Sequence, residues 1–133
     1  MIKGGPNVFV DAKIVGRHET PKRTVVAYIV KDGEEIANGT DVDADETDDA
    51  ELHAVAFAIH ELKHKVPEFT IICDHESAVS VINSANQKAA RKRPILLEIL
   101  AEMRANPGIK VQALESNHAH KYLNQWLAEH PSP

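Results

Sequence analysis

The chain has 133 residues, of which 43% are hydrophobic and 26% charged, which is typical of one globular domain with a single core. We therefore expect one domain over residues 1–133, with an ordered core from about residue 7 to residue 130. The net charge of −5 argues weakly against a polyanionic partner, although the charges are unevenly distributed. No apolar run reaches the ~20 residues of a membrane span, and the first residues do not have the layout of a signal peptide. The single cysteine, Cys73, excludes a disulfide framework and favours a cytoplasmic protein.

The first part of the chain predicts three consecutive strands. Residues 8–13 are a short run rich in β-forming residues, and the polar residues 16–23 then predict a turn. Residues 24–30 are β-branched almost throughout. Asp32-Gly33 is a hairpin signal, and residues 35–40 form the returning strand. These segments predict an antiparallel meander.

An acidic loop follows and leads into a helix. The acids of this loop are Asp41, Asp43, Asp45, Glu46, Asp48 and Asp49. Apolar residues then recur on one helical face, namely Leu52, Val55, Ile59 and Leu62. Asp48 is in position to cap this helix, with Glu51 as the capping-box partner three residues later.

The second half of the chain alternates between strands and helices. We expect a strand over 69–74, a short helix over 77–82, a helix from Pro94 to about 105, a strand over 109–113 and a helix over about 120–129. A meander followed by this alternation predicts an α/β fold, with a five-stranded mixed sheet whose first three strands are antiparallel and which is flanked by helices. Right-handed crossovers would place the first strand beside the fourth, in the middle of the sheet.

Three acids lie on or just after separate elements: Asp11, Glu51 and Asp74. Each has an ordinary explanation, since Asp11 could begin a turn, Glu51 could complete a capping box and Asp74 could cap the next helix. Adjacent first and fourth strands would nevertheless bring Asp11 and Asp74 together, near the start of the helix that carries Glu51. Clustered carboxylates repel one another unless a cation holds them, and their hard oxygen atoms favour Mg²⁺ or Mn²⁺ over Zn²⁺. The pattern therefore indicates a site for phosphodiester chemistry with two metal ions.

Four segments occur in an order and spacing that carry a family resemblance. They are Val8-Phe9-Val10-Asp11, then Thr47-Asp48-Asp49-Ala50-Glu51-Leu52, then Thr70-Ile71-Ile72-Cys73-Asp74 leading to Ser77 and Val81-Ile82-Asn83, and finally residues 120–128. Together they resemble ribonuclease H of type 1 and the wider ribonuclease H-like nucleases. This resemblance implies the five-stranded fold, two Mg²⁺ ions and hydrolysis of the RNA strand of an RNA/DNA hybrid. It also implies that Asp11, Glu51 and Asp74 are the metal-binding acids.

The same resemblance places Gln125 where the family has a fourth carboxylate on the last helix. An amide oxygen can bind Mg²⁺, although without the charge of an acid. Glu115, at the end of the fifth strand, is the nearest acid that could substitute. The alternatives are a slower enzyme, an enzyme that prefers Mn²⁺, and a fold that has lost activity.

The resemblance also implies contacts with the nucleic acid. Ala12 stands where the family commonly has glycine, and Asp48 where it has asparagine; with Lys13, they are candidates for contact with the hybrid. Basic residues fall where the family often has a substrate-binding segment, namely Lys88, Arg91, Lys92 and Arg93. The ordinary alternative for these four residues is a solvated basic start of a helix.

His118 and His120 precede the last predicted helix, where the family has a mobile histidine that assists proton transfer or product release. An exposed loop histidine is the ordinary alternative. The expected partner is an RNA/DNA hybrid, with no membrane and no obligatory protein partner. Two other functions stay open: another nuclease of the same superfamily, such as a Holliday-junction or 3′–5′ exonuclease-like protein, and a non-catalytic module that binds nucleic acid or protein.

Overall fold

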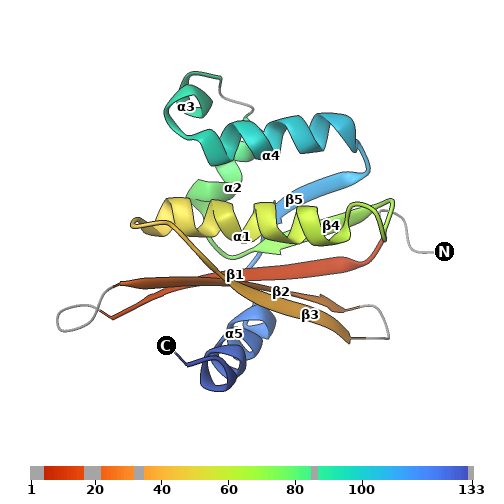
Figure 1. Ribbon diagram of the computed structural model, residues 1–133. Coiled ribbons are helices and arrows are strands. Elements are labelled where there is room, and N and C mark those ends of the chain that lie inside the picture. The colour runs from red at the N-terminus through yellow and green to blue at the C-terminus, as the bar shows by residue number, and fades with distance from the viewer. Residues whose placement is uncertain (1–4, 17–21, 32–34, 85–86, 132–133) are drawn as a thin grey trace.

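The computed structural model describes residues 5–16, 22–31, 35–84 and 87–131. Its strands are β1 (Asn7–Val15), β2 (Arg23–Lys31), β3 (Glu35–Val42), β4 (Phe69–Cys73) and β5 (Ile109–Ala113). Its helices are α1 (Thr47–Leu62), α2 (Glu76–Asn83), α3 (Gln87–Lys92), α4 (Pro94–Ala105) and α5 (His118–Glu129), as labelled in Figure 1. Within the described ranges, no helix has both the length and the apolar character needed to cross a membrane. The predicted hairpin turn at Asp32-Gly33 lies outside these ranges.

The strands form one mixed sheet in the order β3-β2-β1-β4-β5. β2 is antiparallel to both β1 and β3, whereas β4 is parallel to β1 and β5 is parallel to β4. The expected five-stranded mixed sheet is therefore confirmed, with β1 beside β4 at its centre. Figure 1 shows α1 and α4 on one side of the sheet and α5 on the other.

The central strands are apolar on both faces because both faces are covered by helices. In β1, Val8 and Val10 belong to the core cluster that includes the apolar residues of α1. Phe9 lies between them in sequence and packs with Ala119 of α5. Since side chains alternate along a strand, Asp11 follows on the same face as Phe9, toward α5.

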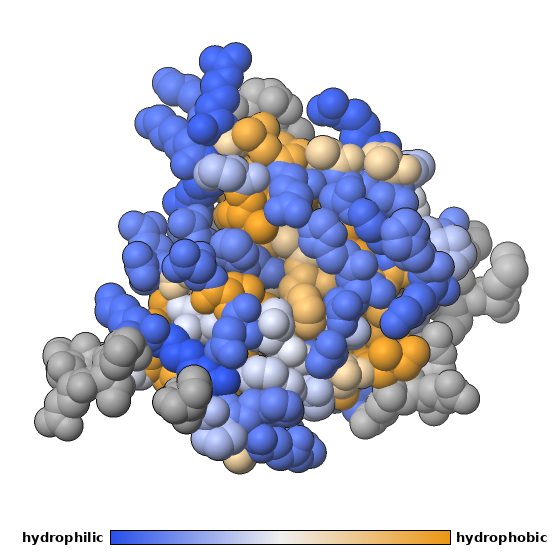
Figure 2. Space-filling view, viewed as in Figure 1, coloured by the Kyte–Doolittle hydropathy of each residue, from blue (hydrophilic) through white to orange (hydrophobic). Residues whose placement is uncertain are grey.

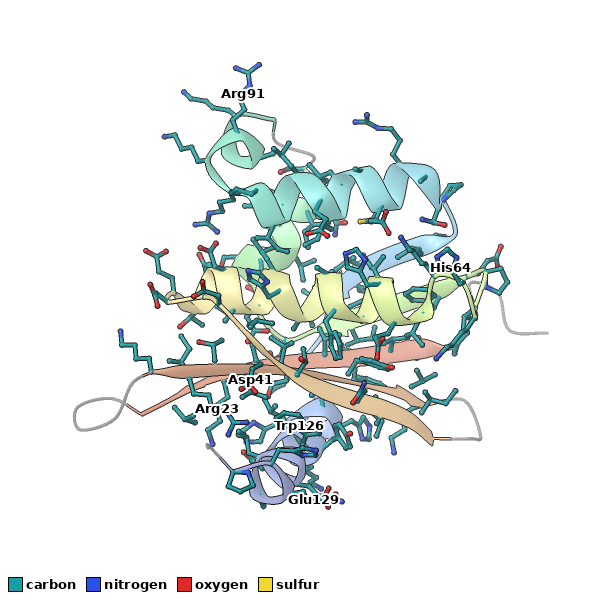
Figure 3. The ribbon with its side chains drawn as sticks, viewed as in Figure 1. Arg23, Asp41, His64, Arg91, Trp126 and Glu129 are labelled. Carbon is teal, nitrogen blue, oxygen red and sulfur yellow. The ribbon has the colours of Figure 1, made fainter. Side chains whose placement is uncertain are left out.

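Trp126 fixes α5 to the sheet. A Cβ atom added to Gly39 of β3 would lie 2.8 Å from the indole ring, so only glycine permits this close approach. The guanidinium carbon of Arg23 lies 5.7 Å from the centre of the indole ring. Nε of Arg23 lies 2.6 Å from Oδ1 of Asp41. Figure 3 shows Arg23, Asp41 and Trp126 together on this side of the sheet. These contacts hold the C-terminal half of α5 against β2 and β3.

Several element boundaries differ from those expected, and one helix is additional. β1 continues to Val15, because its outer part still pairs with β2 after β4 has ended. α5 begins at His118, so the two histidines lie in its first turn and not in a loop. Residues 87–92 form the additional helix α3, which is consistent with a sequence, Gln-Lys-Ala-Ala-Arg-Lys, made of good helix formers.

The predicted capping box at the start of α1 is wrong. The N-cap residue is Glu46, and no side chain caps the helix. Asp48 lies within the first turn and its carboxylate contacts His75 and Ser77 instead. These side chains reach Asp48 from the segment that follows β4, so a tertiary contact takes the place of the local cap.

Candidate functional site

Asp11 and Asp74 lie at the point where β1 and β4 separate. The last paired residues of the two strands are Phe9 and Ile72. Asp11 and Asp74 each follow this pair by two residues, and Asp74 comes directly after Cys73, the end of β4. Because the pairing of these two parallel strands stops there, the two carboxylates come close together, as the sequence predicts.

Glu51 approaches the same edge from α1. It is only 5% exposed, and the thiol of Cys73 donates a hydrogen bond to its Oε2 over 3.6 Å. Ligand atoms of Glu51, Cys73 and Asp74 all lie within 4.8 Å of one another, and no other such group occurs among the described residues. Glu51 is therefore directed at the end of β4 rather than at the start of its own helix.

Burial and repulsion by neighbouring carboxylates disfavour ionisation of Glu51 and Asp11. Burial, followed by the charges of Asp11 and Asp74, raises the pKa of Glu51 from 4.5 to about 8. Burial also raises the pKa of Asp11, against opposing hydrogen bonds from the backbone of Ala12 and from His120. A divalent cation would neutralise the repulsion and allow both carboxyl groups to ionise.

The donor atoms suit a hard cation. Burial, with the nearby Glu51, raises the pKa of the Cys73 thiol to about 12, so the thiol stays protonated at neutral pH in the metal-free protein. The other ligand atoms at this edge are carboxylate oxygens, which are the ligands that Mg²⁺ and Mn²⁺ prefer. The residues present therefore fit the ion that the sequence predicts.

His120 is the residue of α5 that faces Asp11. Its Nδ1 lies 3.2 Å from Oδ2 of Asp11, and its Nε2 lies 3.3 Å from Nδ2 of Asn124. The ammonium group of Lys13 donates to Oδ1 of Asn124 over 3.1 Å. Because Lys13 can only donate, Asn124 must turn its oxygen toward Lys13 and its NH₂ group toward His120. Nε2 of His120 is then the acceptor, and Nδ1 carries the proton that is donated to Asp11.

Of the other residues considered for the far side of the site, Gln125 and His118 make their contacts elsewhere, whereas Glu115 lies in a hollow with Asp74. Gln125 is exposed and its amide donates to Oε1 of Glu129, one turn further along α5, over 3.2 Å. Glu115 is exposed and lines a hollow that also contains Asp74. The ring of His118 packs edge-on against Phe9, with 4.7 Å between the ring centres.

Two hollows flank the three acids. One, of about 280 Å³, is lined by Ala12, Lys13 and Glu51, among others. The other, of about 670 Å³, lies on the β5 side and is lined by Asp74, Glu115 and neighbouring residues. A chain of phosphates could therefore pass over the acids from either side.

The basic residues considered for nucleic-acid contact fall into two groups. Lys88, Arg91 and Lys92 are exposed on α3, and hydrophilic side chains project from that helix in Figure 2. Figure 3 shows Arg91 directed away from the sheet. Arg93, in contrast, lies against α1, where it is 3.9 Å from Asp48 and 3.7 Å from Asp49.

The sequence did not reveal that His75, and Ser77 of the third resembling segment, contact Asp48 beside the site. Nor did it reveal Asn124 as the link between Lys13 and His120. The only signal for His75 and Ser77 in the sequence is that they follow Asp74 closely. Their contact with Asp48 depends on how α1 packs beside α2, which no local pattern reveals.

No family model matches the chain, and neither does any curated protein. Solved structures do match it. The solution structure of the PFV RNase H domain aligns with a TM-score of 0.66 and 15% identity over 93% of this chain and 90% of that one. RNase H1 from the halophilic archaeon Halobacterium salinarum NRC-1 gives a TM-score of 0.66 and 15% identity over 93% of this chain and 98% of that one.

A foamy viral protease-reverse transcriptase in complex with an RNA/DNA hybrid aligns with a TM-score of 0.69 and 11% identity, over 92% of this chain but 19% of that longer one. Identities at this level establish the fold and not the chemistry. The chain has the ribonuclease H-like fold, with the five-stranded mixed sheet and flanking helices that its sequence predicts.

Proposed function

We propose that this chain is a ribonuclease H of type 1, a metal-dependent endoribonuclease that hydrolyses the RNA strand of RNA/DNA hybrids. The observation that carries the proposal is the convergence of Asp11, Glu51 and Asp74 at one edge of the sheet. Burying Glu51 beside two other acids costs free energy in the absence of a cation, as its pKa of about 8 indicates. Such an arrangement is understandable where a metal ion is part of the working protein.

Two divalent ions, when bound, would activate the attacking water and stabilise the leaving 3′ oxygen. Asp11, Glu51 and Asp74 would hold these ions through their carboxylate oxygens, with Asp11 at the centre of the group. The N–H of His120 binds one oxygen of Asp11 and so orients that carboxylate. The hydrolysis would leave a 5′-phosphate and a 3′-hydroxyl group on the products.

The choice of substrate is supported by the shape and charge around the acids. Ala12 and Lys13 line the smaller hollow beside Glu51, and Arg91 and Lys92 present exposed cationic side chains on α3. The matching foamy viral protein was solved with an RNA/DNA hybrid bound. The wide minor groove of such a hybrid is recognised through 2′-hydroxyl and phosphate contacts, which an open surface of this kind can make.

Hydrolysis of a hybrid with a 5′-labelled RNA strand tests this proposal. We expect cleavage by the wild-type protein with Mg²⁺ or Mn²⁺ and none by Asp11→Asn, because the substitution removes a charge from the centre of the site. Asp43→Asn, an exposed acid of the loop before α1, is the matched control and should cleave normally. Single-stranded RNA, duplex DNA and a four-way junction, tested in parallel, separate this activity from other nucleases of the fold. A wild-type protein that cleaves none of them with either metal ion refutes the proposal.

One observation favours a second candidate, a module that binds nucleic acid without cleaving it. Among the described residues of α5, it is His120 and not an acid that faces Asp11. A site with three acids binds a second cation less strongly than a site with four. Titration with Mn²⁺ distinguishes the two functions, because a degenerate site would not bind two ions even when a hybrid is present.

A further inference from the structure

Cys73 and two of the three acids form a group that differs from the group proposed to hold Mg²⁺. One ligand atom from each of Glu51, Cys73 and Asp74 lies within 4.8 Å of the other two. Asp11 does not belong to this group, and its Oδ2 lies 3.2 Å from Nδ1 of His120 instead. The arrangement therefore offers a cation two carboxylates and a sulfur atom.

The spacing of these atoms approaches that of a tetrahedral zinc site. Zn–S bonds of about 2.3 Å and Zn–O bonds of about 2.0 Å place a sulfur and an oxygen ligand roughly 3.5 Å apart. Sγ of Cys73 lies 3.6 Å from Oε2 of Glu51, so this pair already has the required separation. Asp74 follows Cys73 directly and is exposed, so rotation of its side chain can close the remaining gap.

A sulfur atom at this place changes which cations bind most tightly. Mg²⁺ prefers oxygen ligands and gains nothing from Cys73, whereas Zn²⁺ binds thiolate strongly. A coordinating thiol is deprotonated outright, so the proton of Cys73 passes to solvent as the metal–sulfur bond forms. Two carboxylates and one thiolate then surround the ion, and water completes the tetrahedron.

The group can be reached from solvent on the β5 side of the sheet. Cys73 and Glu51 are buried, with exposed fractions of 0% and 5%. Asp74, in contrast, lines the open hollow of about 670 Å³. A cation that enters this hollow can therefore pass from the exposed carboxylate to the two buried ligands.

We propose that Glu51, Cys73 and Asp74 form an inhibitory site for a thiophilic divalent cation such as Zn²⁺. The bound cation takes two of the three carboxylates that the proposed Mg²⁺ ions need and leaves them only Asp11. The site itself does not depend on the proposed function, whereas the inhibition rests on it.

Titration with Co²⁺ tests the site, because Co²⁺ replaces Zn²⁺ and gives a charge-transfer absorption band when it binds thiolate. Cys73 is the only cysteine of the chain, so a band in the wild-type protein must come from this residue. We expect a single Co²⁺ per chain, its displacement by Zn²⁺, and no band with Cys73→Ser. Glu76→Gln, at an exposed acid of the same hollow, is the matched control and should keep the band. A folded wild-type protein that shows no band overturns the inference, whether or not Cys73→Ser folds.

Hydrolysis of the RNA/DNA hybrid in a fixed excess of Mg²⁺ tests the inhibition. Low concentrations of Zn²⁺ should inhibit the wild-type protein. Cys73→Ser should need about tenfold more Zn²⁺ for the same inhibition, which corresponds to roughly 1.4 kcal/mol of binding free energy. Equal inhibition of the two proteins would show that Zn²⁺ acts through the acids alone, and would overturn the inhibitory role of Cys73.

The two measurements separate this inference from the proposed function. Cleavage with Mg²⁺ by a protein that gives no cobalt band overturns the thiophilic site alone. A cobalt band in a protein that cleaves nothing with Mg²⁺ or Mn²⁺ refutes the proposed nuclease function and leaves the cation site standing.

Discussion

Replacement of Glu51 by glutamine should stabilise the metal-free protein at alkaline pH. Glutamine has nearly the same shape as glutamate but carries no charge, so it relieves the repulsion from Asp11 and Asp74 without opening a cavity. At pH 5 the Glu51 carboxyl is protonated in the folded protein and the two proteins should be similar in stability. At pH 9 the wild-type protein must bury an ionised group, and the variant need not.

The sign and size of the effect follow from the pKa of Glu51. A folded-state pKa raised from 4.5 to about 8 means that the contribution of this group to stability is complete below about pH 4.5 and is lost as the pH rises to about 8. At about 1.4 kcal/mol per pKa unit, the rise corresponds to roughly 5 kcal/mol at most. We expect Glu51→Gln to recover about 2 to 5 kcal/mol at pH 9, on the order of 10 °C in the melting temperature.

Thermal unfolding in EDTA between pH 5 and pH 9, followed by circular dichroism, measures this difference. Adding Mn²⁺ should stabilise the wild-type protein strongly and Glu51→Gln only weakly, because the variant offers one charged ligand fewer. Glu68→Gln, an exposed acid in the loop before β4, is the control and should follow the wild-type curve. A wild-type protein whose stability does not change between pH 5 and pH 9, or a variant that is less stable at every pH, would refute the reasoning.

The remaining predictions concern α5, its contact with the sheet and the basic helix. His120→Asp should tighten Mn²⁺ binding, measured by electron paramagnetic resonance, because a fourth carboxylate then faces Asp11; unchanged affinity would contradict this. Gly39→Ala should cost about 1 to 3 kcal/mol in urea unfolding because the new Cβ collides with Trp126, and a neutral effect would show that α5 can shift freely. Arg91→Ala should weaken hybrid binding and reduce the logarithmic salt slope by about one unit; an unchanged slope would remove α3 from the interface.

The sequence was sufficient for the antiparallel meander, for the pairing of β1 with β4 and for the meeting of Asp11 with Asp74. Apolar runs that end on aspartate, and the right-handed crossover that makes β1 and β4 neighbours, are local or topological signals. The convergence of Glu51 on these acids follows from the same topology. The helix that carries Glu51 packs on the sheet with its apolar face and begins near the edge where Asp11 and Asp74 lie.

The sequence could not reveal contacts that depend on how helices pack beside one another. Asp48 reads as a helix cap, yet the docking of α2 beside α1 brings His75 and Ser77 to it. On α5, motif spacing directs attention to Gln125, whereas the helical rotation set by Trp126 turns His120 toward Asp11. Both differences come from the orientation of a whole helix, which a few buried contacts determine.

A crystal of the protein soaked in Mn²⁺ and measured at the manganese absorption edge tests the proposed metal site most directly. We expect anomalous density at the edge of the sheet where β1 and β4 separate, with carboxylate oxygens of Asp11, Glu51 and Asp74 around it. Density elsewhere, or none at this edge while the three acids keep the arrangement described above, would contradict the proposal that they hold a catalytic metal ion.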